Sequence, residues 1–338
     1  MFRFGLIALL ILMVGCSGES EKRDSNCAVG EDCSQTQTDN GNNAPPAEPE
    51  PEYDWPVSSA EYVAEKLSVI TSITINEDED KANYFGQLLG ILGNQATDPN
   101  TLFAGFIENG SLVTALEHRE FTDEDNNILM THLQGKWNEN ATWDSVREGN
   151  AFIYLTTDSF RPDTGHPKSI FRSSKLEGAE LSAQNTVMTF KLPGGDYFDS
   201  VVIHDANIMC SNVEEVAPGY SYSEGEIDGY ITITEFYAGL NGSLGDRCSC
   251  LGITEDIFVE TEEAGTYMCN TAAGNLNACA DLDDFPICEF TMNQCSLLLT
   301  VVARGDLDRS DEIGGNDAMS FRVDFEAKPV GFSGIRNP

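Results

Sequence analysis

The chain has 338 residues, of which 56 are Asp or Glu and 19 are Lys or Arg, so its formal net charge at pH 7 is −37. Nucleic acid is not expected as a partner, because a protein that binds a phosphate backbone needs a basic face to release counterions. Anionic lipid headgroups are disfavoured for the same reason. The excess of carboxylate indicates a soluble, self-repelling surface, with divalent-cation binding as the less favoured alternative.

The first fifteen residues have the composition of an export signal. Arg3 precedes an uncharged apolar run over residues 4–14, which matches the basic and hydrophobic segments of a signal peptide. These eleven residues are too few to span a bilayer, since a membrane-crossing helix takes about 20. The sequence therefore predicts a signal peptide over residues 1–15 that is removed by cleavage.

A cysteine follows this signal directly. The residues Met13-Val14-Gly15-Cys16 resemble the lipobox of bacterial lipoproteins, with Met13 at the position where that family usually has Leu. The resemblance implies acylation of the Cys16 thiol and a stable hold on a lipid bilayer, because each buried methylene contributes about 0.8 kcal/mol. In lipoproteins of this kind Ser17, in place of Asp, favours the outer membrane, on its periplasmic side or at the cell surface.

Residues 16–56 are predicted to form a disordered tether. The segment is rich in Gly, Ser, Asn, Gln and Glu and contains a Pro-rich tract over 44–52, a composition that cannot bury a hydrophobic core. A flexible coil of about 40 residues has a root-mean-square reach of about 35 Å, and proline and acidic repulsion lengthen it. We expect the folded part, residues 57–338, to stand clear of the membrane.

The folded part is expected to open with a helical cap over 57–110. Ser58 and Glu61 have the spacing of a capping box, and Val63, Leu67 and Ile70 would share one face of a helix that begins there.

Two further helices are predicted in the cap. One covers residues 84–92, and the other has Asp98 as N-cap, Pro99 at its first position and Gly110 as terminator. The predicted buried stripe of the last helix comprises Leu102, Phe103, Phe106 and Ile107.

After Gly110 the hydrophobic period changes from that of a helix to two residues. The predicted strands cover 112–118, 128–137, 151–157, 186–192, 201–213, 227–236, 295–304 and 318–327. In the last of them the apolar residues Met319, Phe321, Val323, Phe325 and Ala327 alternate with the polar residues Ser320, Arg322, Asp324 and Glu326, so the polar residues are predicted to face solvent. Strands without long helices between them indicate antiparallel pairing, so residues 111–338 are predicted to be an antiparallel β-sandwich and the whole chain mainly β.

The chain has ten cysteines, and acylation removes Cys16 from the count. In an exported chain disulfides are the expected state. The pair Cys248 and Cys250 has the wrong spacing for a zinc knuckle, so a zinc site is the less favoured alternative. Nine is an odd number, and one thiol therefore stays unpaired within the chain. The disulfide candidates are Cys27, Cys33, Cys210, Cys248, Cys250, Cys269, Cys279, Cys288 and Cys295.

Six of these cysteines lie in the segment 246–295, which is rich in Gly, Asn, Asp and Ala. This pattern predicts a loop-rich excursion stapled by disulfides, with connectivity left open. Cys27 and Cys33 are expected to pair with each other, because the tether offers neither another neighbour. Cys210 is the candidate to tie the excursion to the strand beneath it.

One part of the folded region has a family resemblance. The Leu- and Gly-rich stretch 85–93, followed by Asn109-Gly110-Ser111-Leu112 at the opening of a strand, resembles a group of uncharacterised lipoproteins from bacteria with large secretomes. The likeness covers most of residues 80–338. It implies a lipid-anchored envelope protein and supplies no activity or catalytic residue.

The sequence contains no motif that names a reaction. It lacks the Gly-x-Ser-x-Gly elbow, the phosphate-binding Gly-x-x-x-x-Gly-Lys loop and the His-Glu-x-x-His pair. His204 and Asp205 are adjacent in a predicted strand, where their side chains would point to opposite faces and could not act as a dyad. No catalytic residue is therefore assigned.

An acidic segment before the last predicted strand offers a candidate calcium loop. With Asp306 as position 1, the ligands of a twelve-residue loop would be Asp306, Asp308, Ser310, the carbonyl of Glu312, and Asp317. Asp311 stands where such a loop needs Gly, and Asp317 is shorter than the usual bidentate Glu. A solvated hairpin turn is the favoured alternative.

Taken together, these features favour a surface-displayed binding or structural module, with an unidentified protein or glycan as partner. The alternative from a different class is a secreted hydrolase that acts on envelope or extracellular polymer. A third reading is an assembly or storage partner inside the periplasm.

Overall fold

The computed structural model describes residues 53, 55–56, 58–75, 83–93, 98–120, 127–191, 200–253, 256–263, 265–271, 274–280, 285–302, 305–309 and 315–337. The predicted signal peptide, the lipidation site Cys16, nearly all of the predicted tether and the predicted pair Cys27 and Cys33 lie outside the described residues.

Strands are the commonest secondary structure in the described chain. They are β1 (Lys66–Thr74), β2 (Thr114–Glu120), β3 (Ile128–Trp137), β4 (Phe152–Thr156), β5 (Ser169–Ile170), β6 (Ser173–Glu177), β7 (Glu180–Lys191), β8 (Ser200–Cys210), β9 (Val213–Val216), β10 (Gly219–Thr232), β11 (Phe258–Glu260), β12 (Tyr267–Cys269) and β13 (Ala318–Arg336). The α-helices are α1 (Tyr84–Gly93), α2 (Pro99–Glu108), α3 (Trp143–Arg147), α4 (Ile233–Arg247) and α5 (Phe285–Val302). Short 3-10 turns are η1 (Ser59–Glu61), η2 (Thr157–Ser159), η3 (Ser249–Leu251) and η4 (Leu276–Cys279). The mainly β class is thus confirmed.

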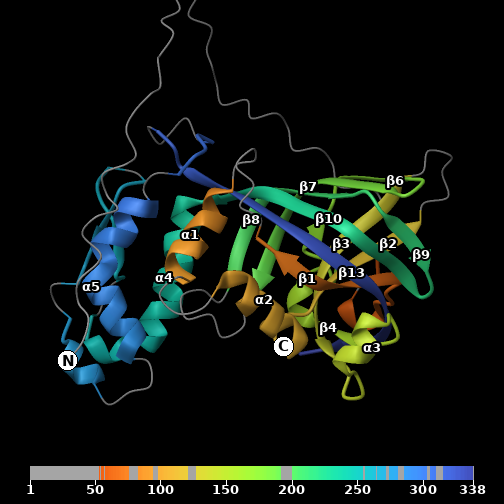
Figure 1. Ribbon diagram of the computed structural model, residues 1–338, viewed down its shortest axis with the longest axis horizontal. Coiled ribbons are helices and arrows are strands. Elements are labelled where there is room, and N and C mark those ends of the chain that lie inside the picture. Colours follow the sequence, from red (N-terminus) through yellow and green to blue (C-terminus); the bar gives the residue numbers. More distant parts are fainter. Residues whose placement is uncertain are drawn as a thin grey trace, which may run out of the picture. The chain divides into compact units, whose positions relative to one another are not determined.

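Eleven strands join in one mixed sheet, in the order β1-β2-β3-β4-β13-β10-β8-β7-β6, with β5 beside β3 and β9 beside β10. Strand β1 also pairs with β13, so that β1, β2, β3, β4 and β13 close into a ring (Figure 1). The pairing of β4 with β13 is parallel, whereas the other strand pairs are antiparallel. The long strand β13 belongs both to this ring and to the rest of the sheet, because its first half pairs with β10 and its end pairs with β4.

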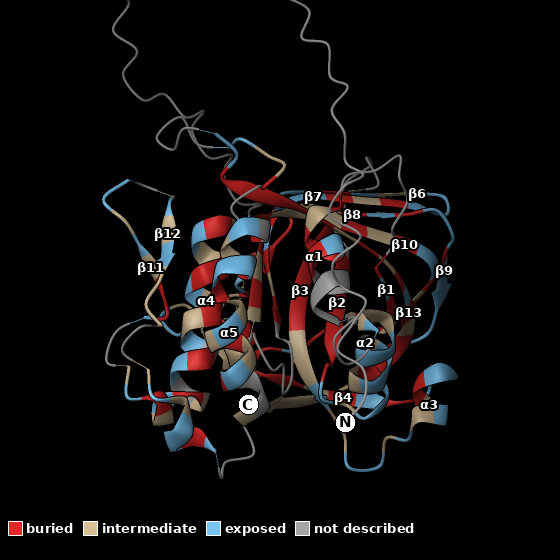
Figure 2. Cartoon of the chain, turned by 60° about the vertical axis from the view of Figure 1, so that its left-hand side comes forward, coloured by how far each residue is buried: buried red, intermediate tan, exposed pale blue. Residues whose placement is uncertain are grey.

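The curled sheet encloses two hydrophobic clusters. One fills the five-stranded ring and includes Leu67, Leu133 and Ile153. The larger one lies between the rest of the sheet and the helices, and it includes Tyr222 and Phe236. Figure 2 shows the buried residues on the inner side of the strands and on the sides of α4 and α5 that face the interior.

The predicted first helix is wrong. Only the turn Ser59–Glu61 is helical, and the chain then enters strand β1. The run contains the β-branched residues Val69, Ile70 and Ile73, which fit a strand that is paired on both edges, here with β2 and β13. The region 57–110 therefore contains a central strand as well as α1 and α2.

The other two predicted helices are confirmed. Helix α2 begins as expected, with Asp98 accepting a hydrogen bond from the backbone N–H of Thr101 at 3.1 Å and Pro99 at the first position. Its buried stripe is narrower than predicted, because Leu102 is 42 % exposed and Ile107 alone is fully buried.

The predicted strand over 295–304 is also wrong, since its residues lie in helix α5 up to Val302. The buried residues Cys295, Leu298 and Val302 are three and four positions apart, while Leu297 is 51 % exposed. A short, nearly continuous apolar run does not distinguish a strand from a helix by itself. The predicted strand 227–236 ends at Thr232, because this residue caps α4 by accepting a hydrogen bond from the Glu235 backbone at 3.2 Å.

Three disulfides hold the region around α4 and α5, as predicted. They are Cys248–Cys288, Cys250–Cys279 and Cys269–Cys295, with Cα–Cα distances of 5.5, 5.3 and 6.0 Å. The first two join the end of α4 and the turn η3 to α5 and η4, and the third joins β12 to α5. The region is less loop-like than predicted, because it contains a β-hairpin and most of a helix. Cys210 does not tie it to the sheet, since this thiol is free and buried in β8.

Candidate ligand groove

An open groove of about 780 Å³ crosses the outward face of the sheet from β1 to β6. The side chains that line it occupy two neighbouring rows of cross-strand partners. The first row runs Thr74, Asp324, Glu226, Met209, Ser182 and Lys175, one residue from each of six adjacent strands. The second row contains Ser72 and Glu326 at one end and Glu180 and Glu177 at the other, with Glu224 and Ser211 between them.

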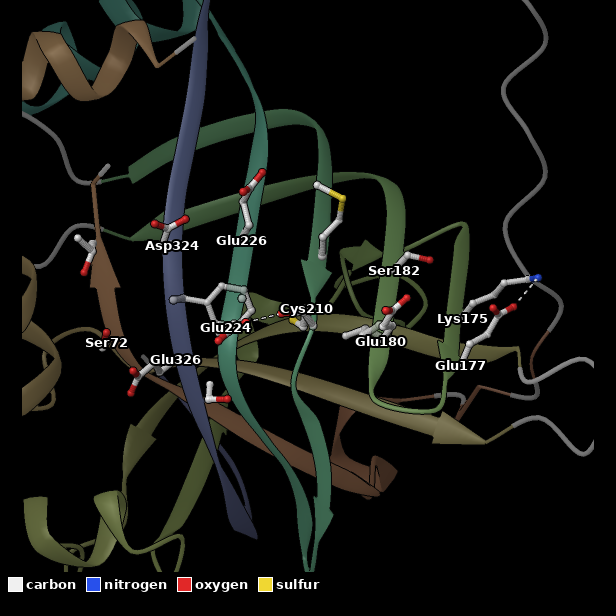
Figure 3. Close-up of a pocket in the computed structure, with 17 residues that line it drawn as sticks. Ser72, Lys175, Glu177, Glu180, Ser182, Cys210, Glu224, Glu226, Asp324 and Glu326 are labelled. Atoms are coloured by element: carbon white, nitrogen blue, oxygen red, sulfur yellow. Dashed lines mark hydrogen bonds and ion pairs between the residues drawn. The ribbon is translucent and has the colours of Figure 1, made fainter. Parts of the chain in front are cut away.

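Six carboxylates stand in these two rows: Glu177, Glu180, Glu224, Glu226, Asp324 and Glu326. Figure 3 shows them in two groups, one on the neighbouring strands β13 and β10 and the other on β7 and β6, with β8 between the groups. Neighbouring carboxylates at such cross-strand positions repel one another. The two rows therefore have a strongly negative electrostatic potential, which would attract a cationic ligand.

Few cations lie within the groove to offset this charge. Lys175 contacts Glu177 at 3.3 Å, and both side chains are largely exposed. Arg322, predicted to face solvent, instead has a mostly buried side chain that forms an ion pair with Glu226. Glu180 and Glu326 are exposed and have no ion pair among the described residues.

The floor of the groove is apolar. Met209 is 45 % exposed between the acidic residues, and its flexible, polarizable thioether suits contact with alkyl chains. Gly225 lies against the ring of Phe325, where a Cβ would be only 2.5 Å from the ring carbons. The Cys210 thiol lies beneath the floor, and burial raises its pKa to about 12, so it stays protonated.

Sequence reasoning did not find the groove. The alternation of β13 places Asp324 and Glu326 outside, and that part could be predicted. The register that sets Glu226 beside Asp324, and Met209 beside Glu226, is a product of pairing between distant segments. This register therefore cannot be predicted from the periodicity of any single segment.

His204 is held by a residue other than its sequence neighbour. Its Nε2 lies 2.5 Å from Oε2 of Glu235, in the first turn of α4, and the hydroxyl of Thr232 donates to the same oxygen at 2.9 Å. The ring of Tyr230 stacks on the imidazole at a centroid distance of 5.4 Å. Among the described residues no hydroxyl or thiol is hydrogen-bonded to His204, so these residues offer the pair no activated nucleophile.

The residues of the candidate calcium loop lie in the connection between α5 and β13. The Asp306 carboxylate accepts hydrogen bonds from the backbone and hydroxyl of Ser320, at 2.8 and 2.6 Å. Asp317 accepts one from the Arg309 backbone at 2.7 Å. These hydrogen bonds hold the connection against the start of β13. Ser320, which is predicted to face solvent, is therefore buried. Of the other three predicted ligands, Asp308 is exposed, and Ser310 and Glu312 lie outside the described residues.

No protein-family model matches the chain, and comparisons with curated proteins and with solved structures give no match. Among the described helices, none has the length and hydropathy needed to cross a membrane.

Proposed function

We propose that this chain is an exported lipoprotein whose folded domain is a binding module for a Lys- or Arg-rich segment of another protein. Acyl chains on Cys16 would hold it to a bilayer, with the tether carrying the domain away from the surface. The residues Met13 to Cys16 and the apolar run before them support this anchor. Ser17 favours the outer membrane.

The observation that carries the binding role is the set of six carboxylates that β13, β10, β7 and β6 present along the groove. A groove lined by one sign of charge concentrates ligands of the opposite sign and accelerates their association. Its length across the sheet suits an extended segment rather than a compact ion. Met209 offers an apolar contact for the methylene stems of Lys or Arg, while their charged heads reach the carboxylates.

Replacing Cys16 with Ser is expected to leave the protein unprocessed or released from membranes, because the acylated thiol is the proposed anchor. Fractionation of cells into soluble and membrane parts, followed by immunoblotting, measures this. A Cys16→Ala variant should behave in the same way, whereas Cys210→Ser should stay membrane-bound. Processing and membrane retention of the Cys16→Ser protein would refute the lipoprotein assignment.

The groove is tested by titrating the protein with a fluorescent hexalysine peptide, with hexaglutamate as the negative probe. We expect saturable binding of hexalysine that weakens with added salt, because salt screens exposed charges within about 10 Å at 0.1 M. The double variant Glu180→Gln/Glu326→Gln should weaken this binding by about tenfold, as two charge-assisted contacts are lost.

The matched control is Glu262→Gln/Glu289→Gln, which neutralises two exposed carboxylates away from the groove and changes the net charge by the same amount. It should leave hexalysine affinity within about twofold of the parent protein, because charges beyond a Debye length are screened. An equal loss in both double variants would show that net charge alone attracts the peptide. The groove would then not be its site.

A further inference from the structure

Two of the three disulfides lie against each other. The Sγ atoms of Cys250, Cys279 and Cys288 are all within 4.8 Å of one another, although they belong to two different disulfides. The sulfur of Cys248 is bonded to that of Cys288 and therefore adjoins the same group. These four sulfurs form a sulfur cluster at one point of the fold.

Four separate backbone positions bring the sulfur cluster together. Cys248 caps the end of α4, Cys250 lies in the turn η3, Cys279 in η4 and Cys288 in α5. The turn η3 is closed by the Leu251 N–H, which donates to the Cys248 carbonyl at 2.9 Å. Two cysteines only two positions apart thus both reach the cluster. Its geometry therefore does not depend on the spacing by which a zinc knuckle is recognised in a sequence.

The sulfur cluster is enclosed. Cys248, Cys279 and Cys288 are 3 %, 0 % and 0 % exposed, and they belong to the same hydrophobic cluster as the buried residues Leu244 and Leu251. When the chain is synthesised its cysteines are thiols, so four thiols would occupy this buried point before any disulfide forms. Thiolates in such surroundings need a cation to compensate their charge.

We propose that the reduced chain binds one Zn²⁺ at the sulfur cluster, through the thiolates of Cys248, Cys250, Cys279 and Cys288. A structural zinc site is tetrahedral with Zn–S bonds of about 2.3 Å, which sets its sulfurs about 3.8 Å apart. The four sulfurs are already gathered at comparable distances. Binding converts four thiols and one Zn²⁺ into a tetrathiolate complex and four protons, with no electron transferred. The site is independent of the acidic groove and of the function proposed for it.

Zinc and the two disulfides exclude each other, because a sulfur in a disulfide is not a thiolate ligand. Oxidation by a small disulfide such as oxidised glutathione moves two electrons from each pair of thiolates to one glutathione disulfide. Each exchange forms one protein S–S bond and two glutathione thiolates, and the Zn²⁺ is released. The same four residues therefore hold α4, α5, η3 and η4 together in either redox state.

The test is a titration of the full chain, reduced and then freed of reductant without oxygen, with Co²⁺ followed by Zn²⁺. One Co²⁺ per chain should bind with the sulfur-to-cobalt charge-transfer and visible bands of a tetrahedral tetrathiolate, and Zn²⁺ should displace it. Calorimetry in two buffers at pH 7 should show about four protons released per Zn²⁺, because an ordinary thiol has a pKa of about 8.5. The oxidised protein should lack these bands. No binding by the reduced chain, or a spectrum of fewer than four sulfur ligands, would overturn the proposal.

Matched double variants locate the site. Cys250→Ser/Cys279→Ser removes two of the four ligands, so it should weaken Co²⁺ binding by at least about a hundredfold and abolish the tetrathiolate spectrum. The control, Cys269→Ser/Cys295→Ser, removes the same number of thiols and the disulfide outside the cluster, and it should keep both the stoichiometry and the spectrum. Circular dichroism of each reduced variant checks that its secondary structure is retained. Undiminished binding in the first variant, or an equal loss in both, would overturn the proposal.

Discussion

Replacing Glu117 with Ala is expected to lower the free energy of unfolding by about 3–5 kcal/mol, the usual cost of breaking a buried ion pair by removing one partner. One oxygen of Glu117 accepts from the backbone of Glu65 and from the Arg119 guanidinium, both at 3.0 Å. The other accepts from the hydroxyls of Tyr62 and Thr131. The side chains of Glu117 and Arg119 are 0 % and 6 % exposed.

The destabilisation comes from the buried charge of Arg119, which remains after Glu117 is removed. Arg119 lies against the rings of Tyr53, Trp55 and Tyr62, with centroid distances of 5.2, 5.5 and 4.7 Å. Burial, together with the Glu117 charge, raises the pKa of Tyr62 well above its ordinary value, so this phenol remains a donor. Without Glu117, the Arg119 guanidinium would lose its buried counter-charge and the Tyr62 hydroxyl would lose its acceptor.

Urea unfolding followed by tryptophan fluorescence measures this loss. The control is Glu65→Ala, which removes the second carboxylate near Arg119, at 3.2 Å and 45 % exposed. Solvent-exposed pairs of this kind contribute about 0–1 kcal/mol. The double variant Glu117→Leu/Arg119→Met should recover much of the stability, because an apolar pair avoids the desolvation of two charges. If the Glu117→Ala variant were as stable as the Glu65→Ala variant, the proposed importance of the buried Glu117–Arg119 pair would be disproved.

Acidification from pH 6.5 to 4.5 is expected to reduce stability by about 5 kcal/mol through two buried histidines. Burial lowers the pKa of His118 to about 3 and that of His132 to about 4. His118 is hydrogen-bonded to the Tyr222 hydroxyl, whereas Nε2 of His132 has no hydrogen-bond partner in the part of the chain that the structure describes. In the unfolded chain both imidazoles have a pKa of about 6.5. Below that pH the unfolded state binds more protons than the folded state.

The stability contributed by these neutral histidines is therefore fully present above pH 6.5. It falls by about 1.4 kcal/mol per pH unit for each histidine until the folded pKa is reached. Urea midpoints at pH 7.5, 6 and 5 measure the slope. His132→Leu should make this slope shallower, because it removes one of the two titrating imidazoles. Equal midpoints for the parent protein at pH 7.5 and 5 would contradict the prediction.

The parts of the fold that could be predicted are those encoded within one segment. The alternation from Met319 to Ala327 identifies a strand, and Asp98 with Pro99 identifies a helix start, because each signal involves neighbours along the chain. Cysteine spacing and the expected compartment predict disulfides for 248–295 but not their connectivity, which depends on how α4, α5 and the hairpin pack.

The two wrong elements have a common cause. The segment after Ser58 has a capping signal and an apolar spacing compatible with a helix, yet pairing with β13 on one edge and β2 on the other makes it a strand. The apolar run after Cys295 is predicted to be a strand but lies in helix α5. In both cases partners distant in sequence decide between two local structures. The groove follows the same rule, because its rows exist only once Glu226 and Met209 are in register.

Strand β13 also sets the order in which this protein can reach its final form. Its residues are the partners of β1, β10 and β4, and Leu67 pairs with Val330, 263 positions later in the chain. One edge of each of those three strands therefore has no partner while the chain is being made. Pairings so remote form slowly, and open strand edges invite association with other chains. The sheet can therefore close only after β13 has been synthesised, and until then the three open strand edges are the part of the fold most exposed to association with other chains.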